Sequence, residues 1–186
     1  MKKNICIFGG SNSGKNTENK RTALLIGKII AENNFNIVFG GGEKGIMGSV
    51  ASSGIKHGAK TTGVIPKFLM QNDIINLSHS NLFNKELIST ETMHERKKIM
   101  YDLSDAFLIL PGGVGTLDEC FEVLTWCQLN LIKNKNIGII NFLGYWDPLI
   151  TLINHIVEEK FMSSFNLNYF EEIKDIKILK KFLKNI

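Results

Sequence analysis

The residues best suited to bind a phosphate form a glycine-rich turn at positions 111–116 (PGGVGT). This turn follows an apolar run and opens a segment with helical spacing. Glycines let the backbone turn sharply and approach a ligand closely, and the N–H groups and dipole at a helix N-terminus favour an anion. No lysine follows the last glycine, so the turn is not a P-loop. The predicted phosphate-binding residues are Gly112, Gly113, Val114, Gly115 and Thr116.

Glu119 follows this turn, and its spacing permits two interpretations. A carboxylate beside a phosphate site can act as a general base or stabilise positive charge on a bound ligand. The segment from Thr116 to Glu119 also has the pattern of a capping box, in which Thr116 caps a helix and Glu119 binds back to the Thr116 amide. From the spacing alone, both interpretations stay open.

A basic segment at positions 93–98 (MHERKK) is the next candidate. Arg96 and Lys97 point in neighbouring directions on a helix, and an arginine offers a rigid fork for phosphate or carboxylate. A run of charges on a helix is more commonly a solvated face, and that interpretation stays beside the functional one. No set of His, Cys, Asp and Glu has the spacing of metal ligands, so no metal is predicted.

Two further glycine-rich turns also follow apolar runs, at positions 9–14 (GGSNSG) and 40–48 (GGGEKGIMG). Two or three such turns in one sheet favour a shared ligand site, to which Gly10, Ser11, Gly41 and Gly42 would contribute. The alternative is a surface loop in the first case and a tight turn with close helix-to-sheet packing in the second.

The elements that must position these turns alternate along the whole chain. Apolar runs predict strands, and apolar spacing of three and four predicts helices. Strands are expected at 4–8, 36–39, 61–65, 87–90, 106–110 and 137–142, and helices at 17–32, 46–57, 92–103, 117–131, 146–160 and 173–184. Residues 67–84 are irregular, as in a substrate loop. The alternation predicts one α/β domain over residues 1–186, a doubly wound parallel sheet with helices on both faces. Ligands of such sheets bind at the carboxyl ends of the strands.

Composition narrows the class of protein. The chain has 186 residues, 44% apolar and 22% charged, as in globular proteins. Its apolar runs are too short for a membrane span, and its first residues do not form a secretory signal. Cys6, Cys120 and Cys127 form no CxxC pair, which predicts reduced, buried thiols in the cytoplasm. The net charge of +4 comes from dispersed lysines and favours anionic substrates without requiring a nucleic acid.

Taken together, these motifs resemble those of the Lonely Guy (LOG) family, the cytokinin-activating phosphoribohydrolases whose bacterial members are often labelled lysine decarboxylases. The family motif PGGxGTxxE matches residues 111–119 at every fixed position. The motif MHxRK matches residues 93–97, and GGGxxGxMGxVA matches residues 40–51. The resemblance extends from residue 4 to about residue 162.

This resemblance implies a Rossmann-like fold and a homodimer. It also implies an enzyme that hydrolyses the N-glycosidic bond of a nucleoside 5′-monophosphate. The substrate would be AMP or an N6-modified AMP of the cytokinin type, the products would be the free base and ribose 5-phosphate, and no cofactor is expected. Arg96 and Glu119 match the catalytic pair. Further matches to substrate-binding positions are Met93, Lys97, Thr125 and Asp73, the last in place of a family glutamate. Asp118 likewise stands where a glutamate is common.

Other functions remain open beside this one. A nucleotide sensor or a molybdenum-cofactor carrier would have the same fold and bind its ligand without turnover. A pyridoxal-phosphate decarboxylase would need a Schiff-base lysine, and nothing marks Lys44 or Lys97 as one. Nucleic-acid binding would rest on net charge alone, without a recognisable module.

Overall fold

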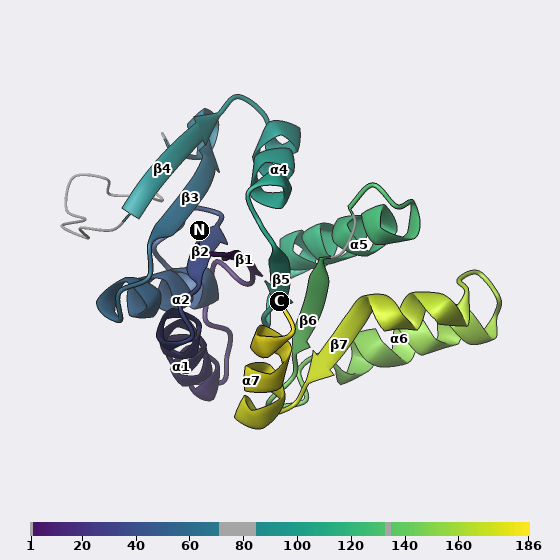
Figure 1. Cartoon of the computed structure of the whole chain (residues 1–186). Helices are drawn as coiled ribbons and strands as arrows, with labels where there is room; N and C mark the ends of the chain where they lie inside the picture. Colours follow the sequence, from purple (N-terminus) through teal and green to yellow (C-terminus); the bar gives the residue numbers. More distant parts are fainter. Residues whose placement is uncertain (1, 71–84, 133–134) are drawn as a thin grey trace.

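A computed structural model describes residues 2–70, 85–132 and 135–186, and its strands form one parallel sheet (Figure 1). The strands are β1 (Asn4–Phe8), β2 (Asn36–Phe39), β3 (Thr61–Pro66), β4 (Lys85–Thr90), β5 (Ala106–Ile109), β6 (Asn136–Ile140) and β7 (Phe170–Ile173). Their order across the sheet is β4-β3-β2-β1-β5-β6-β7. Every neighbouring pair is parallel, so each connection must cross over the sheet.

Helices cover both faces of this sheet. One apolar cluster joins α1 (Glu18–Glu32), α2 (Gly45–Lys56) and α7 (Ile176–Lys184) to one face. A second cluster joins α4 (Met93–Asp102), α5 (Val114–Gln128) and α6 (Asp147–Glu158) to the other. Successive side chains of β1 alternate between them, because Ile5 and Ile7 enter the first cluster while Cys6 and Phe8 enter the second. The predicted doubly wound α/β fold is confirmed.

The strand order reverses between β1 and β5. From β1 the chain proceeds outward through β2 and β3 to β4, and from β5 it proceeds the other way through β6 to β7. The pairing of Cys6 with Phe107 and of Phe8 with Ile109 fixes the register at this boundary. Crossovers therefore diverge to opposite sides of the β1–β5 pair, which leaves a crevice at the carboxyl ends of these strands.

Three expected segments differ from the structure by more than about two residues at an end or in their type. The helix expected at 173–184 begins only at Ile176, because Phe170–Ile173 forms the edge strand β7. The helix expected at 117–131 begins at Val114 and ends at Gln128. The stretch expected to be irregular begins with a short helix, α3 (Lys67–Met70), and residues 71–84 lie outside the described part of the chain. Across the described residues, none of the helices has the length and apolar character that crossing a membrane requires.

Candidate active site

The glycine-rich turns after β1 and β5 meet at the switch point. The amide of Gly10 donates a hydrogen bond to the carbonyl of Pro111 at 3.0 Å, and the carbonyl of Gly10 accepts one from Ile46 at 2.9 Å. The approach is so close that a Cβ on Gly112 would lie 2.8 Å from the Gly10 nitrogen and 2.1 Å from Thr116 Oγ1. Only glycine fits at position 112, so the meeting of the turns explains this part of the motif.

A cavity of about 500 Å³ lies above these turns. Most of the predicted site residues line it, and they come from the turns after β1, β2 and β5 and from α4 and α5. These residues are Gly10, Ser11, Gly42, Met93, Arg96, Gly113, Val114, Gly115, Thr116 and Glu119. The structure thus brings together segments more than a hundred residues apart in the chain.

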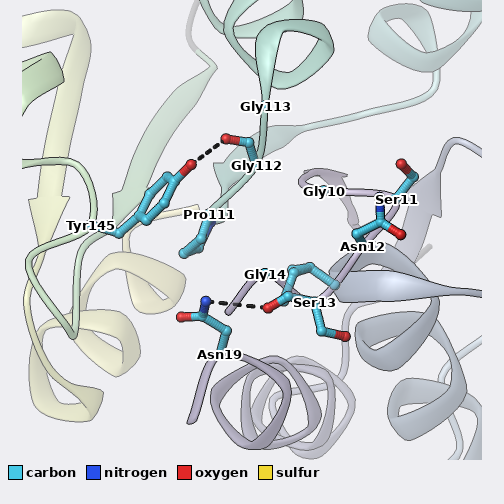
Figure 2. Close-up of a pocket in the computed structure, with 11 residues that line it drawn as sticks. Gly10, Ser11, Asn12, Ser13, Gly14, Asn19, Pro111, Gly112, Gly113 and Tyr145 are labelled. Atoms are coloured by element: carbon cyan, nitrogen blue, oxygen red, sulfur yellow. Dashed lines mark hydrogen bonds between the residues drawn. The ribbon is translucent and has the colours of Figure 1, made fainter. Parts of the chain in front are cut away.

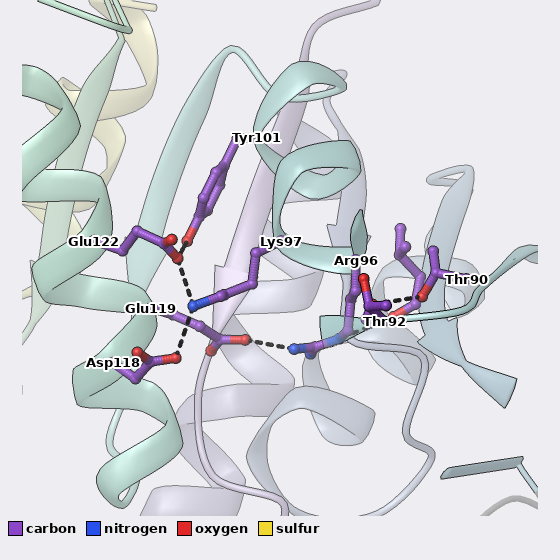
Figure 3. Close-up of polar contacts among 9 residues, drawn as sticks. Thr90, Thr92, Arg96, Lys97, Tyr101, Asp118, Glu119 and Glu122 are labelled. Carbon is purple, nitrogen blue, oxygen red and sulfur yellow. Dashed lines mark hydrogen bonds and ion pairs between the residues drawn. The ribbon is translucent and has the colours of Figure 1, made fainter. Parts of the chain in front are cut away.

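An ion pair between Arg96 and Glu119 forms the charged wall of this cavity (Figure 3). Arg96 Nη1 donates to Glu119 Oε1 at 3.0 Å, and Arg96 Nε donates to the carbonyl of Val64 at 3.1 Å. Each of the two charged residues is only 6% exposed. The interpretation of the basic segment as a solvated face is therefore wrong for Arg96 and for Lys97, which is 7% exposed.

The absence of a side chain at Gly40 makes room for the guanidinium. A Cβ on Gly40 would lie 2.1 Å from Arg96 Nη2, well inside van der Waals contact. The second glycine-rich turn therefore contributes the space that the Arg96 guanidinium occupies. The spacing of the sequence did not reveal this role of Gly40.

Glu119 is not part of a capping box. Helix α5 begins at Val114 with Gly113 as its N-cap, three residues before the expected start, and Leu117 N donates to the Gly113 carbonyl. The carboxylate of Glu119 instead binds Arg96. Burial raises the pKa of Glu119 above its ordinary value, and the Arg96 guanidinium opposes that rise. The functional interpretation of Glu119 is the one that its contacts favour.

A capping box does form, at the start of α4. Thr92 Oγ1 accepts from the Glu95 amide at 3.1 Å, and Glu95 Oε2 accepts from the amide of Thr92 at 3.4 Å and from that of Glu91 at 2.9 Å. Sequence reasoning missed this box, although its Thr-x-x-Glu signature is plain in the chain. The box fixes the first turn of α4 and thereby the place from which Arg96 reaches the cavity.

Four other predicted site residues lie away from the cavity lining. Lys97 Nζ binds Asp118 and Glu122 between α4 and α5. Thr125 donates to the Phe121 carbonyl at 2.7 Å and lines an apolar groove on the other side of α5. Gly41 and Gly112 support the turns without lining the cavity, and Asp73 lies outside the described residues.

Gly112 lines a second, smaller cavity of about 260 Å³ beside the β1 turn (Figure 2). Its walls include Ser11, Ser13 and the ring of Tyr145, whose hydroxyl donates to the Gly112 carbonyl at 2.6 Å. Tyr145 was not among the predicted site residues. The β6–α6 connection that carries Tyr145 thus supports the phosphate-binding candidate through this contact.

The three cysteines are free and buried, as predicted. Burial raises the pKa of the Cys120 thiol to about 12 and also raises the pKa values of Cys6 and Cys127. Raised thiol pKa values leave little of the reactive thiolate at neutral pH. These residues therefore belong to the core rather than to the chemistry of the site. Among the described residues, no cluster of three His, Cys, Asp or Glu side chains could hold a metal ion.

The fold and site define a Rossmann-like α/β protein with a cavity at its switch point that is walled by a buried ion pair. Solved structures of this fold include the molybdenum cofactor binding protein of Rippkaea orientalis, with a TM-score of 0.68 and 19% identity over 99% of this chain and 96% of that one. The molybdenum cofactor carrier protein of Chlamydomonas reinhardtii gives 0.65 and 21% over 99% of each chain. At these identities the likeness concerns the fold alone.

Residues 47–182 match the family described as "Possible lysine decarboxylase". The chain is 41% identical to the cytokinin riboside 5′-monophosphate phosphoribohydrolase LOG2 of Arabidopsis thaliana over 160 residues, which cover 86% of this chain and 72% of the relative. It is also 41% identical to LOG7 of the same plant, over 87% and 71% of the two chains. The chain belongs to this Lonely Guy family, as its motifs predicted.

Proposed function

We propose that this chain is a nucleoside 5′-monophosphate phosphoribohydrolase that acts on cytokinin riboside 5′-monophosphates or AMP. The observation that carries the proposal is the buried Arg96–Glu119 pair on the wall of a cavity whose floor is the Gly113–Thr116 turn. The names of the plant relatives, matched over most of this chain, support the same reaction. One site thus offers an anion-binding turn and a carboxylate at a short distance from each other along α5.

The 5′-phosphate would bind at the start of α5. The first turn of an α-helix carries backbone N–H groups without intrahelical acceptors, and the helix dipole adds partial positive charge there. Thr116 lies in this turn, is buried and lines the cavity, so its hydroxyl can donate to a phosphate oxygen. Binding energy from the phosphate would hold the ribose over Glu119 and align the bond to be broken.

Hydrolysis would then proceed through an oxocarbenium-like state. As the bond from the base nitrogen to ribose C1′ breaks, its electron pair leaves with the base and positive charge grows on the sugar. The Glu119 carboxylate would stabilise that charge and accept a proton from the attacking water, whose oxygen bonds to C1′. Arg96 would hold Glu119 in place through the 3.0 Å contact and bind substrate oxygens with its remaining donors. The departing base takes up one proton, which balances the reaction.

We also propose a homodimer in a reducing compartment such as the cytoplasm. An apolar groove between α5 and α6, lined by Phe121, Leu124 and Phe161, supports the homodimer, because exposed apolar surface marks interaction sites and Phe161 is 86% exposed. Light scattering should give twice the mass of one chain, and Phe161→Glu should shift the protein towards the monomer. A monomeric wild-type protein at assay concentrations would contradict this part of the proposal.

Glu119→Gln tests the reaction most sharply at the residue level. Glutamine keeps the size and the hydrogen-bonding oxygen but removes the charge that stabilises the transition state. We expect kcat for base release from AMP to fall by about 100-fold to 1,000-fold, while ribose 5-phosphate still binds. Chromatography of the free base and an assay for ribose 5-phosphate should give equal amounts for the wild type. Unchanged kcat in the variant would remove Glu119 from the mechanism. Nucleotide binding without turnover by the wild type would favour a sensor or carrier.

A further inference from the structure

A second polar bridge between α4 and α5 lies directly beside the Arg96–Glu119 pair (Figure 3). Lys97 Nζ is 2.8 Å from Glu122 Oε2 and 3.1 Å from Asp118 Oδ2. Burial lowers the pKa of Lys97, but the two carboxylates more than offset it, so the pKa lies above its ordinary value and the ammonium stays charged. The three groups therefore form a charged bridge rather than a set of independent surface residues.

Tyr101 extends this bridge into the core. Its hydroxyl donates to Glu122 Oε2 at 2.7 Å, the same oxygen that Lys97 contacts. The ring is fully buried and packs edge-on against Phe8, Phe107 and Trp126. Burial raises the pKa of Tyr101, so its hydroxyl keeps its proton and remains a donor. A rigid side chain thus fixes one end of the bridge.

Asp118 forms the other end, at the cavity wall. Its side chain is 57% exposed, whereas that of Lys97 is 9% exposed. Asp118 lines the cavity, and Lys97 contacts it from behind. The Asp118 charge also helps to raise the pKa of the neighbouring Glu119, while the Lys97 charge lowers it. The place of Asp118 therefore affects the electrostatics of the reacting centre.

We propose that Tyr101 and Glu122 are positioning residues, which hold Lys97 between the helices so that Lys97 fixes the Asp118 carboxylate beside Glu119. The family resemblance implied that Lys97 is a substrate ligand. In this proposal Lys97 instead acts through Asp118. This inference rests on the proposed hydrolase function, since it assigns residues that tune the same site. Neither Tyr101 nor Glu122 belongs to the motifs that identified the family.

A double-mutant cycle tests the bridge. Tyr101→Phe removes the hydroxyl and keeps the packed ring, and Asp118→Asn removes the charge at the cavity wall. We expect each variant to lower kcat/KM about threefold to tenfold, the range for one lost hydrogen bond. Because both act on one chain of contacts, the double variant should lose no more activity than the single variant with the larger loss.

Ser53→Ala is the matched control. It also removes one hydroxyl hydrogen bond of a buried residue, the 2.6 Å contact with the Leu24 carbonyl between α1 and α2. We expect it to lower thermal stability about as much as Tyr101→Phe and to leave kcat/KM unchanged. Losses that multiply in the double variant, or unchanged kcat/KM in Tyr101→Phe, would overturn the positioning role.

The same four proteins are then compared by calorimetry, which gives the dissociation constant of ribose 5-phosphate for each. Binding does not need turnover, so this measurement separates the positioning role of the bridge from the proposed hydrolase function. A wild-type protein that releases no base would overturn the proposed function. Coupling of Tyr101 with Asp118 in binding would still support the bridge, and independent effects there would overturn it.

Discussion

Replacing Gly40 by alanine should displace the guanidinium of Arg96 while leaving every charge of the site in the protein. The new Cβ would lie 2.1 Å from Arg96 Nη2, whereas non-bonded heavy atoms normally stay about 3.5 Å apart. The backbone at Gly40 is held by its place directly after β2, so the flexible end of Arg96 has to give way. The guanidinium must then move by more than about 1 Å from the position in which its Nη1 contacts Glu119.

The expected cost falls on catalysis. Misplacing a catalytic group by about 1 Å costs on the order of 100-fold in rate, so we expect kcat/KM to fall by about that factor. The acid limb of the pH profile should also move to higher pH. The Arg96 charge opposes the rise in the pKa of Glu119, and moving this charge away lets the pKa rise further.

Gly54→Ala is the matched control for this variant. Its Cβ would lie 2.3 Å from Cδ1 of Ile37, again the end of a side chain, but in the packing of α2 against β2 away from the cavity. Steady-state kinetics of base release from AMP, with thermal melts of both variants, should show loss of activity for Gly40→Ala alone. Activity of Gly40→Ala within threefold of the wild type would refute the reasoning, because the exact place of Arg96 would then be unimportant.

Three further predictions concern the pH profile, a glycine-rich turn and a helix cap. In the wild type, kcat/KM should rise with pH through a value above 4.5, because the reaction needs ionised Glu119 and burial raises its pKa; an acid limb at or below 4.5 in a pH–rate profile would count against this role. Gly45→Ala should lower the free energy of unfolding in urea by about 2 kcal/mol or more, since φ there is +69° and the Cβ would lie 2.2 Å from the Ser11 backbone carbon. Thr92→Ala should lower it by about 1 kcal/mol through loss of the α4 cap, and an unchanged midpoint would show the cap to be unimportant.

Much of the fold follows from the sequence because its central strands are buried on both faces. The runs at Asn4–Phe8 and Ala106–Ile109 are nearly continuous in apolar residues, which is what a central parallel strand requires. The edge strand Phe170–Ile173 was missed because two of its four residues are glutamates and it is only partly buried. An edge strand pairs with only one neighbouring strand, and its charged side chains can face solvent. Its sequence therefore lacks the continuous apolar run that predicts a central strand.

The site was predictable as a set of motifs but not in its contacts. The sequence contains Thr-x-x-Glu at Thr92 and at Thr116, and only the first is a capping box, because Gly113 starts the second helix one turn earlier. The burial of Arg96 depends on the missing side chain at Gly40, 56 positions away, and no local pattern encodes such a contact. The motifs in the sequence indicated which residues could form a site. The order of the strands in the sheet determines which of these residues contact one another.

The most direct measurement compares nucleoside monophosphates with the matching nucleosides. Purified protein is incubated with AMP, isopentenyl-AMP, adenosine and isopentenyladenosine, and the released base is quantified by chromatography. If the Gly113–Thr116 turn anchors a 5′-phosphate over Glu119, base should appear from the monophosphates and at most slowly from the nucleosides. Equal release from both, or release from neither, would contradict a phosphate-anchored hydrolase at this site.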